Sequence, residues 1–181
     1  MPANDDKLIL PFRTDLCVTH TTGTPLMIRA NLCFIVRGGE VLLIRKKRGL
    51  GAGKINGPGG KIDPGETALE SAIRETFEEL LVRPIAPRQV GELLFEFRDG
   101  LRLHCAVFLA HDFTGTAAET DEAIPLWTRV DAIPYNEMWA DDRYWLPLLL
   151  RGDLFRGTFE FDGETLCDHH LEVLPAGTTF D

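Results

Sequence analysis

The stretch that decides the fold runs from Gly60 to Val82 and reads GKIDPGETALESAIRETFEELLV. Thr67 followed by Glu70 forms a capping-box pattern, which predicts that a helix begins at this point. Pro84 is expected to end the helix, and the spacing of apolar residues predicts its buried side. The expected apolar stripe consists of Leu69, Ile73, Thr76 and Leu80, with Ala72 and Phe77 at its borders.

Three glutamates gather on one side of this helix. Glu75, Glu78 and Glu79 have the spacing that places side chains on a shared face, beside the apolar stripe. Converging carboxylates repel one another, and Mg²⁺ relieves the repulsion because it prefers carboxylate, water and phosphate oxygens. A solvated acidic surface is the alternative interpretation. The loop before the helix favours the metal, because its glycines let the backbone approach a ligand closely: Gly57, Gly59 and Gly60.

Taken together, these positions resemble the signature of the Nudix hydrolase family, G-x5-E-x7-R-E-U-x-E-E-x-G-U, in which U is apolar. Two positions depart from the signature, since Thr76 stands at an apolar position and Leu81 at the second glycine. The matching residues are Gly60, Glu66, Arg74, Glu75, Glu78, Glu79 and Val82.

The resemblance implies an α+β protein with the Nudix fold, a mixed β-sheet in an α/β/α sandwich. It also implies hydrolysis of a phosphoanhydride by water with Mg²⁺ as the cofactor and Mn²⁺ as an alternative ion. Glu66 and Arg74 are expected to pair structurally and fix the loop against the helix, with a plain surface ion pair as the alternative.

The same resemblance implies the metal ligands and the catalytic base. Glu75, Glu78 and Glu79 are expected to bind the metal with help from the Gly59 carbonyl. Glu122, beyond the signature, is the candidate for a further ligand. The base that accepts a proton from water is expected to be Glu79, with Glu122 as the second candidate. Glu75 belongs to the same coupled set of catalytic carboxylates, in which sequence does not separate base from ligand.

Basic and glycine residues of the preceding loop are expected to face the substrate. Lys46 is the favoured partner for phosphate oxygens, and Lys61 is a weaker candidate. The neighbouring Lys47 and Arg48 are also candidates to pair with phosphate oxygens, with a solvated basic turn as the alternative. The backbone of Gly59 and Gly60 is expected to lie against the substrate as well.

Three further stretches are similar to the oxidised-purine nucleoside triphosphatases within this family. They are Lys46–Lys61, Glu137–Leu150 and Phe155–Leu166. This resemblance implies that the substrates are oxidised purine nucleoside triphosphates such as 8-oxo-dGTP. The expected products are the monophosphate and pyrophosphate, and the expected role is sanitation of the nucleotide pool.

By position, the resemblance also implies how the purine is bound. Asn56, Asp141 and Asp142 are expected to contact the base edge, since an amide and two carboxyl groups offer both donors and acceptors. Trp139 is expected to pack on the base face, and Asn31 stands near the base where a threonine is usual. In isolation, each of these residues has a structural interpretation, such as a helix cap for Asp141 or a turn residue for Asn56.

Composition narrows the class of protein. The chain has 181 residues and a net charge of -9, which suits one main domain and argues against nucleic-acid partners. Its four cysteines form no closely spaced pair, which is typical of a reduced, cytoplasmic protein. No apolar run is long enough for a membrane span. We expect a monomer that acts on a small nucleotide.

The chain is expected to divide into an N-terminal extension or hairpin over residues 1–27 and a Nudix domain over residues 28–181. A second helix is expected from Asp141 to Leu150. The expected strands are Ala30–Val36, Val41–Ile44, Val90–Phe97, Leu101–Ala110, Leu126–Val130, Leu154–Phe161 and Thr165–Val173.

Other functions remain open at this point. One is a Nudix pyrophosphatase for another nucleoside diphosphate derivative, such as ADP-ribose. Another is a nucleotide-binding module without catalysis, against which the retention of Glu75, Glu78 and Glu79 argues. An RNA-decapping enzyme is disfavoured by the acidic balance of the chain.

Overall fold

The computed structural model describes residues 27–180. The expected extension or hairpin over residues 1–27 lies outside the described residues, apart from Met27, which begins the first strand. No helix within the described part of the chain is long and apolar enough to span a membrane.

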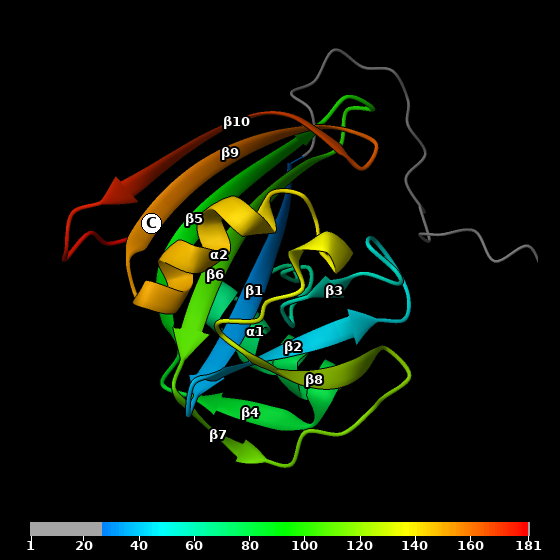
Figure 1. The fold of residues 1–181 in the computed structure, drawn as a ribbon, viewed down its shortest axis with the longest axis vertical. Helices are drawn as coiled ribbons and strands as arrows, with labels where there is room; N and C mark the ends of the chain where they lie inside the picture. The colour runs from blue at the N-terminus through cyan, green and yellow to red at the C-terminus, as the bar shows by residue number, and fades with distance from the viewer. Residues whose placement is uncertain (1–26, 181) are drawn as a thin grey trace, which may run out of the picture.

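Most of the chain forms an eight-stranded mixed sheet (Figure 1). The strand order is β10-β9-β5-β6-β1-β2-β3, and β8 also pairs with β2. β1 pairs with β6 and β5 pairs with β9 in parallel, whereas the remaining neighbours are antiparallel. The strands are β1 Met27–Arg37, β2 Glu40–Lys46, β3 Ile55–Asn56, β5 Arg88–Phe97, β6 Arg102–Ala110, β8 Ala123–Arg129, β9 Leu154–Asp162 and β10 Thr165–Leu174.

The expected strands are all present, and their ends differ where pairing extends or shortens them. β8 begins at Ala123, earlier than the expected Leu126, because it pairs with β2 as far as Lys46. The sequence did not reveal the short elements. These are β3, the separate two-stranded sheet of β4 (Val82–Ile85) and β7 (Asp112–Gly115), and a 3-10 helix at Tyr135–Glu137.

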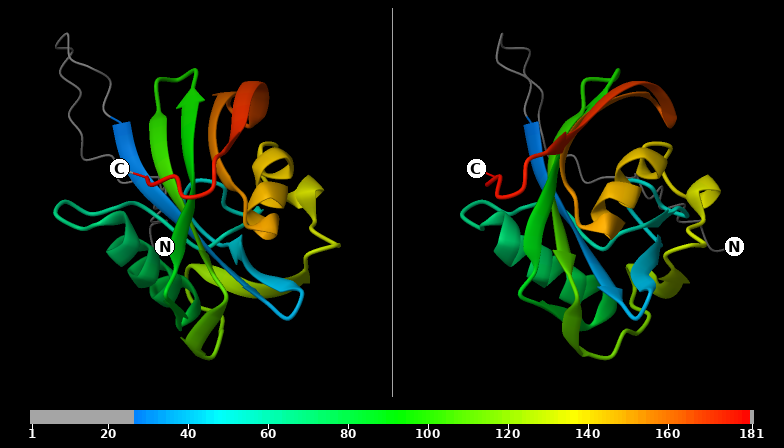
Figure 2. Two further views of the ribbon diagram at one scale, coloured as in Figure 1. Left: turned by 90° about the vertical axis from the view of Figure 1, so that its left-hand side faces the viewer. Right: turned by 60° about the vertical axis from the view of Figure 1, so that its left-hand side comes forward.

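Two helices cover opposite faces of the sheet, α1 (Ala68–Leu80) and α2 (Asp142–Arg151) (Figure 2). The alternation along β1 explains the two layers, since Cys33 and Ile35 join the clusters on the α1 side and Phe34 joins the cluster on the α2 side. The sheet is therefore buried on both faces, and the expected α+β sandwich is confirmed.

Helix α1 begins as expected, with Thr67 as its N-cap and a complete capping box with Glu70. The expected apolar stripe is partly wrong, because Leu69 and Phe77 are 42% and 36% exposed. The residues that are buried are Ser71, Ala72, Thr76, Glu79 and Leu80. Small side chains at three of these positions let the helix lie close to β1. Glu79 is buried together with them.

Helix α1 ends at Leu80, before the expected stop at Pro84, which instead lies in β4. Leu81 caps the helix with φ 61°, in the left-handed region that usually requires glycine, and its N–H donates to the Phe77 carbonyl. The departure from the signature at Leu81 therefore leaves the usual helix exit intact, with a leucine in a strained conformation.

Candidate active site

The glycine loop before α1 lies flat against β1. The N–H of Cys33 donates to the Pro58 carbonyl at 2.8 Å, and that of Asn31 donates to the Gly60 carbonyl at 2.9 Å. Gly59 has φ 150°, and a Cβ at this position would lie 2.2 Å from the carbonyl oxygen of Asn31. Only glycine fits there, so the close approach of loop and strand is fixed by the sequence.

Glu79 is the most deeply buried of the three helix glutamates, with 1% of its surface exposed. Its Oε2 accepts a hydrogen bond from the Gly59 N–H at 2.9 Å, and its Oε1 lies 3.2 Å from Nζ of Lys46. Burial raises the pKa of Glu79, and the charge of Lys46 opposes this rise. The structure thus places a desolvated carboxylate directly against the glycine loop.

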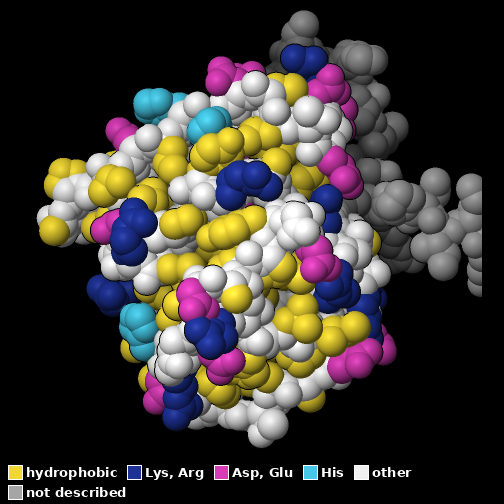
Figure 3. All heavy atoms as spheres, viewed as in Figure 1, with side chains coloured by type: hydrophobic (Ala, Val, Ile, Leu, Met, Phe, Trp, Pro, Cys, Tyr) yellow, Lys and Arg dark blue, Asp and Glu magenta, His cyan; other side chains and the backbone are white. Residues whose placement is uncertain are grey.

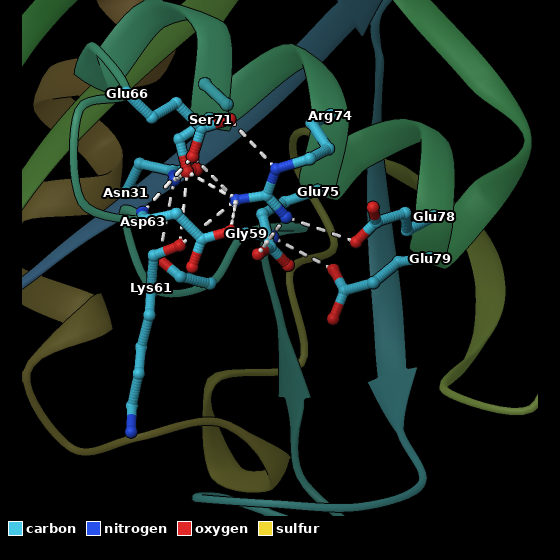
Figure 4. Close-up of polar contacts among 12 residues, drawn as sticks. Asn31, Gly59, Lys61, Asp63, Glu66, Ser71, Arg74, Glu75, Glu78 and Glu79 are labelled. Carbon is cyan, nitrogen blue, oxygen red and sulfur yellow. Dashed lines mark hydrogen bonds and ion pairs between the residues drawn. The ribbon is translucent and has the colours of Figure 1, made fainter.

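Arg74 organises the remaining glutamates (Figure 4). It binds Glu66 through two 2.8 Å hydrogen bonds, and this pairing lowers the pKa of Glu66 to about 2. The same guanidinium contacts Glu75 at 2.7 Å and Glu78 at 3.2 Å. The pairing of loop and helix expected for Glu66 and Arg74 is present, and it is bidentate.

The oxygen donors at this point fit a hard divalent cation. Burial raises the pKa of Glu75 as well as that of Glu79, so a divalent cation bound here would stabilise the ionised form of both carboxylates. A Cβ on Gly60 would lie 2.3 Å from Oε2 of Glu75, so the carboxylate and the loop backbone are in contact. Within residues 27–180, however, no three acidic, histidine or cysteine side chains form a ready metal cluster. Arg74 and Lys46 hold the glutamates instead.

Glu122 lies on the loop before β8, where it forms an ion pair with Arg48. Thr120 ties this loop to the helix, since its hydroxyl donates to the Glu79 carbonyl at 2.9 Å and accepts from the Glu122 N–H. Lys47 anchors the loop from the other side through Glu119. Lys47 is therefore not a solvated turn residue, since its side chain holds the loop in place through the ion pair with Glu119.

A cavity of about 510 Å³ adjoins the glycine loop. On the face that carries α2, hydrophobic side chains gather between charged ones (Figure 3). The cavity brings together ten of the residues expected to bind substrate or metal, whereas Glu75, Glu78 and Glu79 do not line it. These ten are Asn31, Lys46, Asn56, Gly59, Gly60, Lys61, Glu122, Trp139, Asp141 and Asp142.

Two adjacent aspartates lie deep in this cavity, and each is 2% exposed. Asp141 accepts a hydrogen bond from Nε1 of Trp145 at 2.7 Å, and Asp142 accepts one from the Trp139 N–H at 3.1 Å. Burial raises the pKa of Asp141 to about 6, and burial together with the charge of Asp141 raises the pKa of Asp142 well above its ordinary value. Burial and mutual repulsion disfavour the doubly charged state of such a pair, so one carboxyl group can donate a hydrogen bond while its neighbour accepts one. Asp141 is the N-cap residue of α2 by position only, because its carboxylate makes no capping bond.

Trp139 forms part of the cavity wall. Its ring meets Phe97 and Phe161 edge-on at centroid distances of 6.3 and 5.5 Å. Nζ of Lys54 lies 5.2 Å from its centroid, and a Cβ on Gly51 would lie 2.8 Å from its Nε1. The sequence indicates only that Phe97 and Phe161 lie in strands, because alternation predicts burial but does not say which residues border a cavity.

Two of the expected base contacts are engaged elsewhere in this structure. Oδ1 of Asn56, at the end of β3, accepts a hydrogen bond from the adjacent Gly57 N–H at 2.8 Å. Nδ2 of Asn31 donates to the hydroxyl of Ser71 at 2.9 Å, on helix α1. Both residues border the cavity. Of the two, Asn31 is the one whose side chain bonds to helix α1.

This chain is similar in sequence and fold to several known proteins. The NUDIX domain family matches residues 26–149. The chain is 42% identical over 143 residues to an oxidized purine nucleoside triphosphate hydrolase of Danio rerio, covering 78% of this chain and 92% of that protein. It is 40% identical over 142 residues to the protein of the same name from Mus musculus, covering 77% and 91%. A solved MutT protein from Bacillus halodurans superposes with a TM-score of 0.73 at 27% identity, covering 80% of this chain and 97% of that one. The signature, the fold and these relatives lead to one conclusion: the chain belongs to the Nudix family.

Proposed function

We propose that this protein hydrolyses oxidised purine nucleoside triphosphates to the monophosphate and pyrophosphate, with Mg²⁺ as its cofactor and Mn²⁺ as an alternative. One observation carries the proposal: a cavity in which two adjacent buried aspartates, whose pKa values are both raised, and an indole ring adjoin the glycine loop of the Nudix signature. The names of the relatives from Danio rerio and Mus musculus support the same substrate class.

The aspartate pair suits a purine with an altered edge. Oxidation of a purine changes which of its ring positions donate and which accept hydrogen bonds. A carboxyl group donates and its ionised neighbour accepts, so Asp141 and Asp142 can pair with such an edge. Trp139 adds stacking that tolerates different purines, because every base has a π face.

The phosphates would extend from the cavity towards the glycine loop and Lys46. Glu75, Glu78, Glu79, Glu122 and the Gly59 carbonyl are the candidates to hold the metal. When bound, the metal neutralises the phosphates and lowers the pKa of water. Lys46, which pairs with Glu79 in this structure, would then be available to a phosphate oxygen.

Glu79 is our candidate for the base that accepts the proton of the attacking water. It is buried, its pKa is raised, and the Gly59 N–H holds one of its oxygens in a fixed direction. A raised pKa makes a carboxylate a stronger proton acceptor near neutral pH. Glu122 is the second candidate and lies on a loop tied to Glu79 through Thr120.

The test is a panel of nucleotides with Mg²⁺ in which every product is identified. We expect 8-oxo-dGTP to yield 8-oxo-dGMP and pyrophosphate faster than dGTP yields its products. Equal turnover of the two would refute the sanitising role and leave a general pyrophosphatase. Preferential cleavage of ADP-ribose would point to a diphosphate derivative instead. Binding of nucleotides without any turnover would leave only a binding module.

A further inference from the structure

The side chain of Asn31 on β1 bonds both to the glycine loop and to helix α1 (Figure 4). Its Nδ2 donates to Oγ of Ser71 at 2.9 Å and to the Gly60 carbonyl at 3.3 Å. Its backbone N–H donates to that same carbonyl at 2.9 Å. Asn31 is 2% exposed and Ser71 fully buried, so water does not replace these bonds easily.

Ser71 in turn bonds to Arg74, a residue that holds signature glutamates. Its hydroxyl donates to the Lys61 carbonyl at 3.2 Å and accepts from Nη2 of Arg74 at 3.1 Å. Arg74 in turn holds Glu75 and Glu78 of the signature. One chain of hydrogen bonds therefore runs from Asn31 on β1 to Glu75 and Glu78, two of the candidate metal ligands.

The same contacts fix the direction of the Gly59 carbonyl. The peptide groups on either side of it are both tethered, because the Pro58 carbonyl accepts from Cys33 and the Gly60 carbonyl accepts twice from Asn31. Glycine alone would leave this backbone free to rotate. With both neighbours held, the Gly59 carbonyl keeps one orientation, which is what a metal ligand requires.

Asn31 maintains this arrangement at a cost. Its Oδ1 is buried and has no hydrogen-bond partner within residues 27–180. Buried acceptors without a partner are rare and destabilise a protein. An apolar side chain of similar size would avoid that cost but would lose both bonds of Nδ2, so what the amide adds at this position is its link to Ser71 and Gly60. Side chains that break a packing rule are commonly found where function requires them.

We propose that Asn31 is a positioning residue for the metal, acting through Ser71 and Gly60 rather than through the purine. This inference rests on the proposed metal-dependent hydrolysis, and it departs from the expectation that Asn31 contacts the base. Its role is to hold the loop and Arg74 in register, so that the Gly59 carbonyl and the glutamates meet the ion together.

The experiment measures Mn²⁺ binding without nucleotide, from the electron paramagnetic resonance signal of free Mn²⁺. The variants are Asn31→Leu, Ser71→Ala and the double variant, so that each end of the link is removed separately. Thr76→Val is the matched control, because Thr76 is also a buried polar residue of α1, and its hydroxyl donates to the Ala72 carbonyl rather than to a residue of the link from Asn31 to Arg74. Thermal unfolding without metal confirms that each variant is folded.

We expect both single variants to raise the Mn²⁺ dissociation constant by about 10-fold, the range typical of lost support behind a metal ligand. The double variant should be no worse than either single variant, because both changes break one link. Thr76→Val should bind Mn²⁺ like the unaltered protein. In turnover assays, the preference between 8-oxo-dGTP and dGTP should stay constant while the Mg²⁺ requirement rises.

The outcomes separate this inference from the proposed function. Unchanged Mn²⁺ affinity in Asn31→Leu and Ser71→Ala, with normal binding by the unaltered protein, overturns the role of Asn31 alone. Unchanged affinity together with a lost preference for 8-oxo-dGTP assigns Asn31 to the base instead. An unaltered protein that binds no Mn²⁺ contradicts the metal site itself and both proposals with it.

Discussion

Replacing Asp141 with asparagine should stabilise the folded protein at neutral pH and lower its affinity for the oxidised purine nucleotide. Asp141 is 2% exposed and adjoins the equally buried Asp142, so its ionised form is disfavoured in the folded chain. An asparagine keeps the oxygen that accepts from Trp145, and it cannot ionise. Stability and substrate binding should therefore change in opposite directions.

The magnitude follows from the pKa of Asp141, which folding raises from 3.8 to about 6. The folded chain binds more protons than the unfolded chain between these values, so wild-type stability falls as pH rises through this window. At about 1.4 kcal/mol per pH unit, the interval of about 2 units corresponds to about 3 kcal/mol. The hydrogen bond from Trp145 is already contained in this pKa, because it favours the ionised form. Asp141→Asn, which cannot ionise, is therefore expected to gain about 3 kcal/mol over the wild type at pH 8.

The assay is urea unfolding of the wild type and Asp141→Asn at intervals from pH 4 to pH 8. The variant should match the wild type near pH 4 and exceed it progressively above that. Asp121→Asn is the matched control, since Asp121 is exposed, and its difference from the wild type should stay close to zero. A difference for Asp141→Asn that is constant across the pH range would refute the reasoning, and so would an unchanged KM for 8-oxo-dGTP.

Other predictions test the rest of the site. Glu79→Gln should lower turnover by at least about 100-fold with nucleotide binding retained in calorimetry, and near-normal turnover would exclude Glu79 as the base. Gly60→Ala places a Cβ 2.3 Å from Oε2 of Glu75 and should weaken Mn²⁺ binding. Gly39→Ala, whose Cβ meets open space, should leave Mn²⁺ binding unchanged, and equal behaviour of the two would contradict the contact. Trp139→Leu should raise KM for purine nucleotides more than it lowers kcat, and an unchanged KM would remove the indole from the base site.

Local patterns in the sequence predicted the start of the helix and the glycine loop that lie beside the proposed metal ligands. The capping box, the glutamate spacing and the glycine loop depend on residues that are close in the chain. The structure contains the capping box, and its glycine loop is hydrogen-bonded to β1. The apolar stripe was misjudged because amphipathic spacing ranks Leu69 and Phe77 above small residues. Close packing on β1 instead favours Ser71, which lets the helix approach.

Contacts between distant segments could not be predicted in this way. The bond between Asn31 and Ser71 spans 40 positions, and no pattern in either segment indicates it. In the sequence, Phe97 and Phe161 have the pattern of ordinary strand residues. The pairing of β5 with β9 brings their rings together beside Trp139 in the wall of the cavity. The raised pKa of Asp141 depends on the depth of the cavity, which is a property of the packed fold.

The central claim is that a purine held by the aspartate pair is hydrolysed at the signature glutamates. Its most direct test is a competition in which 8-oxo-dGTP and dGTP share one tube with Mg²⁺, and the two monophosphates are counted separately. We predict that 8-oxo-dGMP accumulates at least about 10-fold faster, and that chelation of the metal stops both reactions. Equal accumulation of the two monophosphates, or hydrolysis that continues after chelation, would contradict the account.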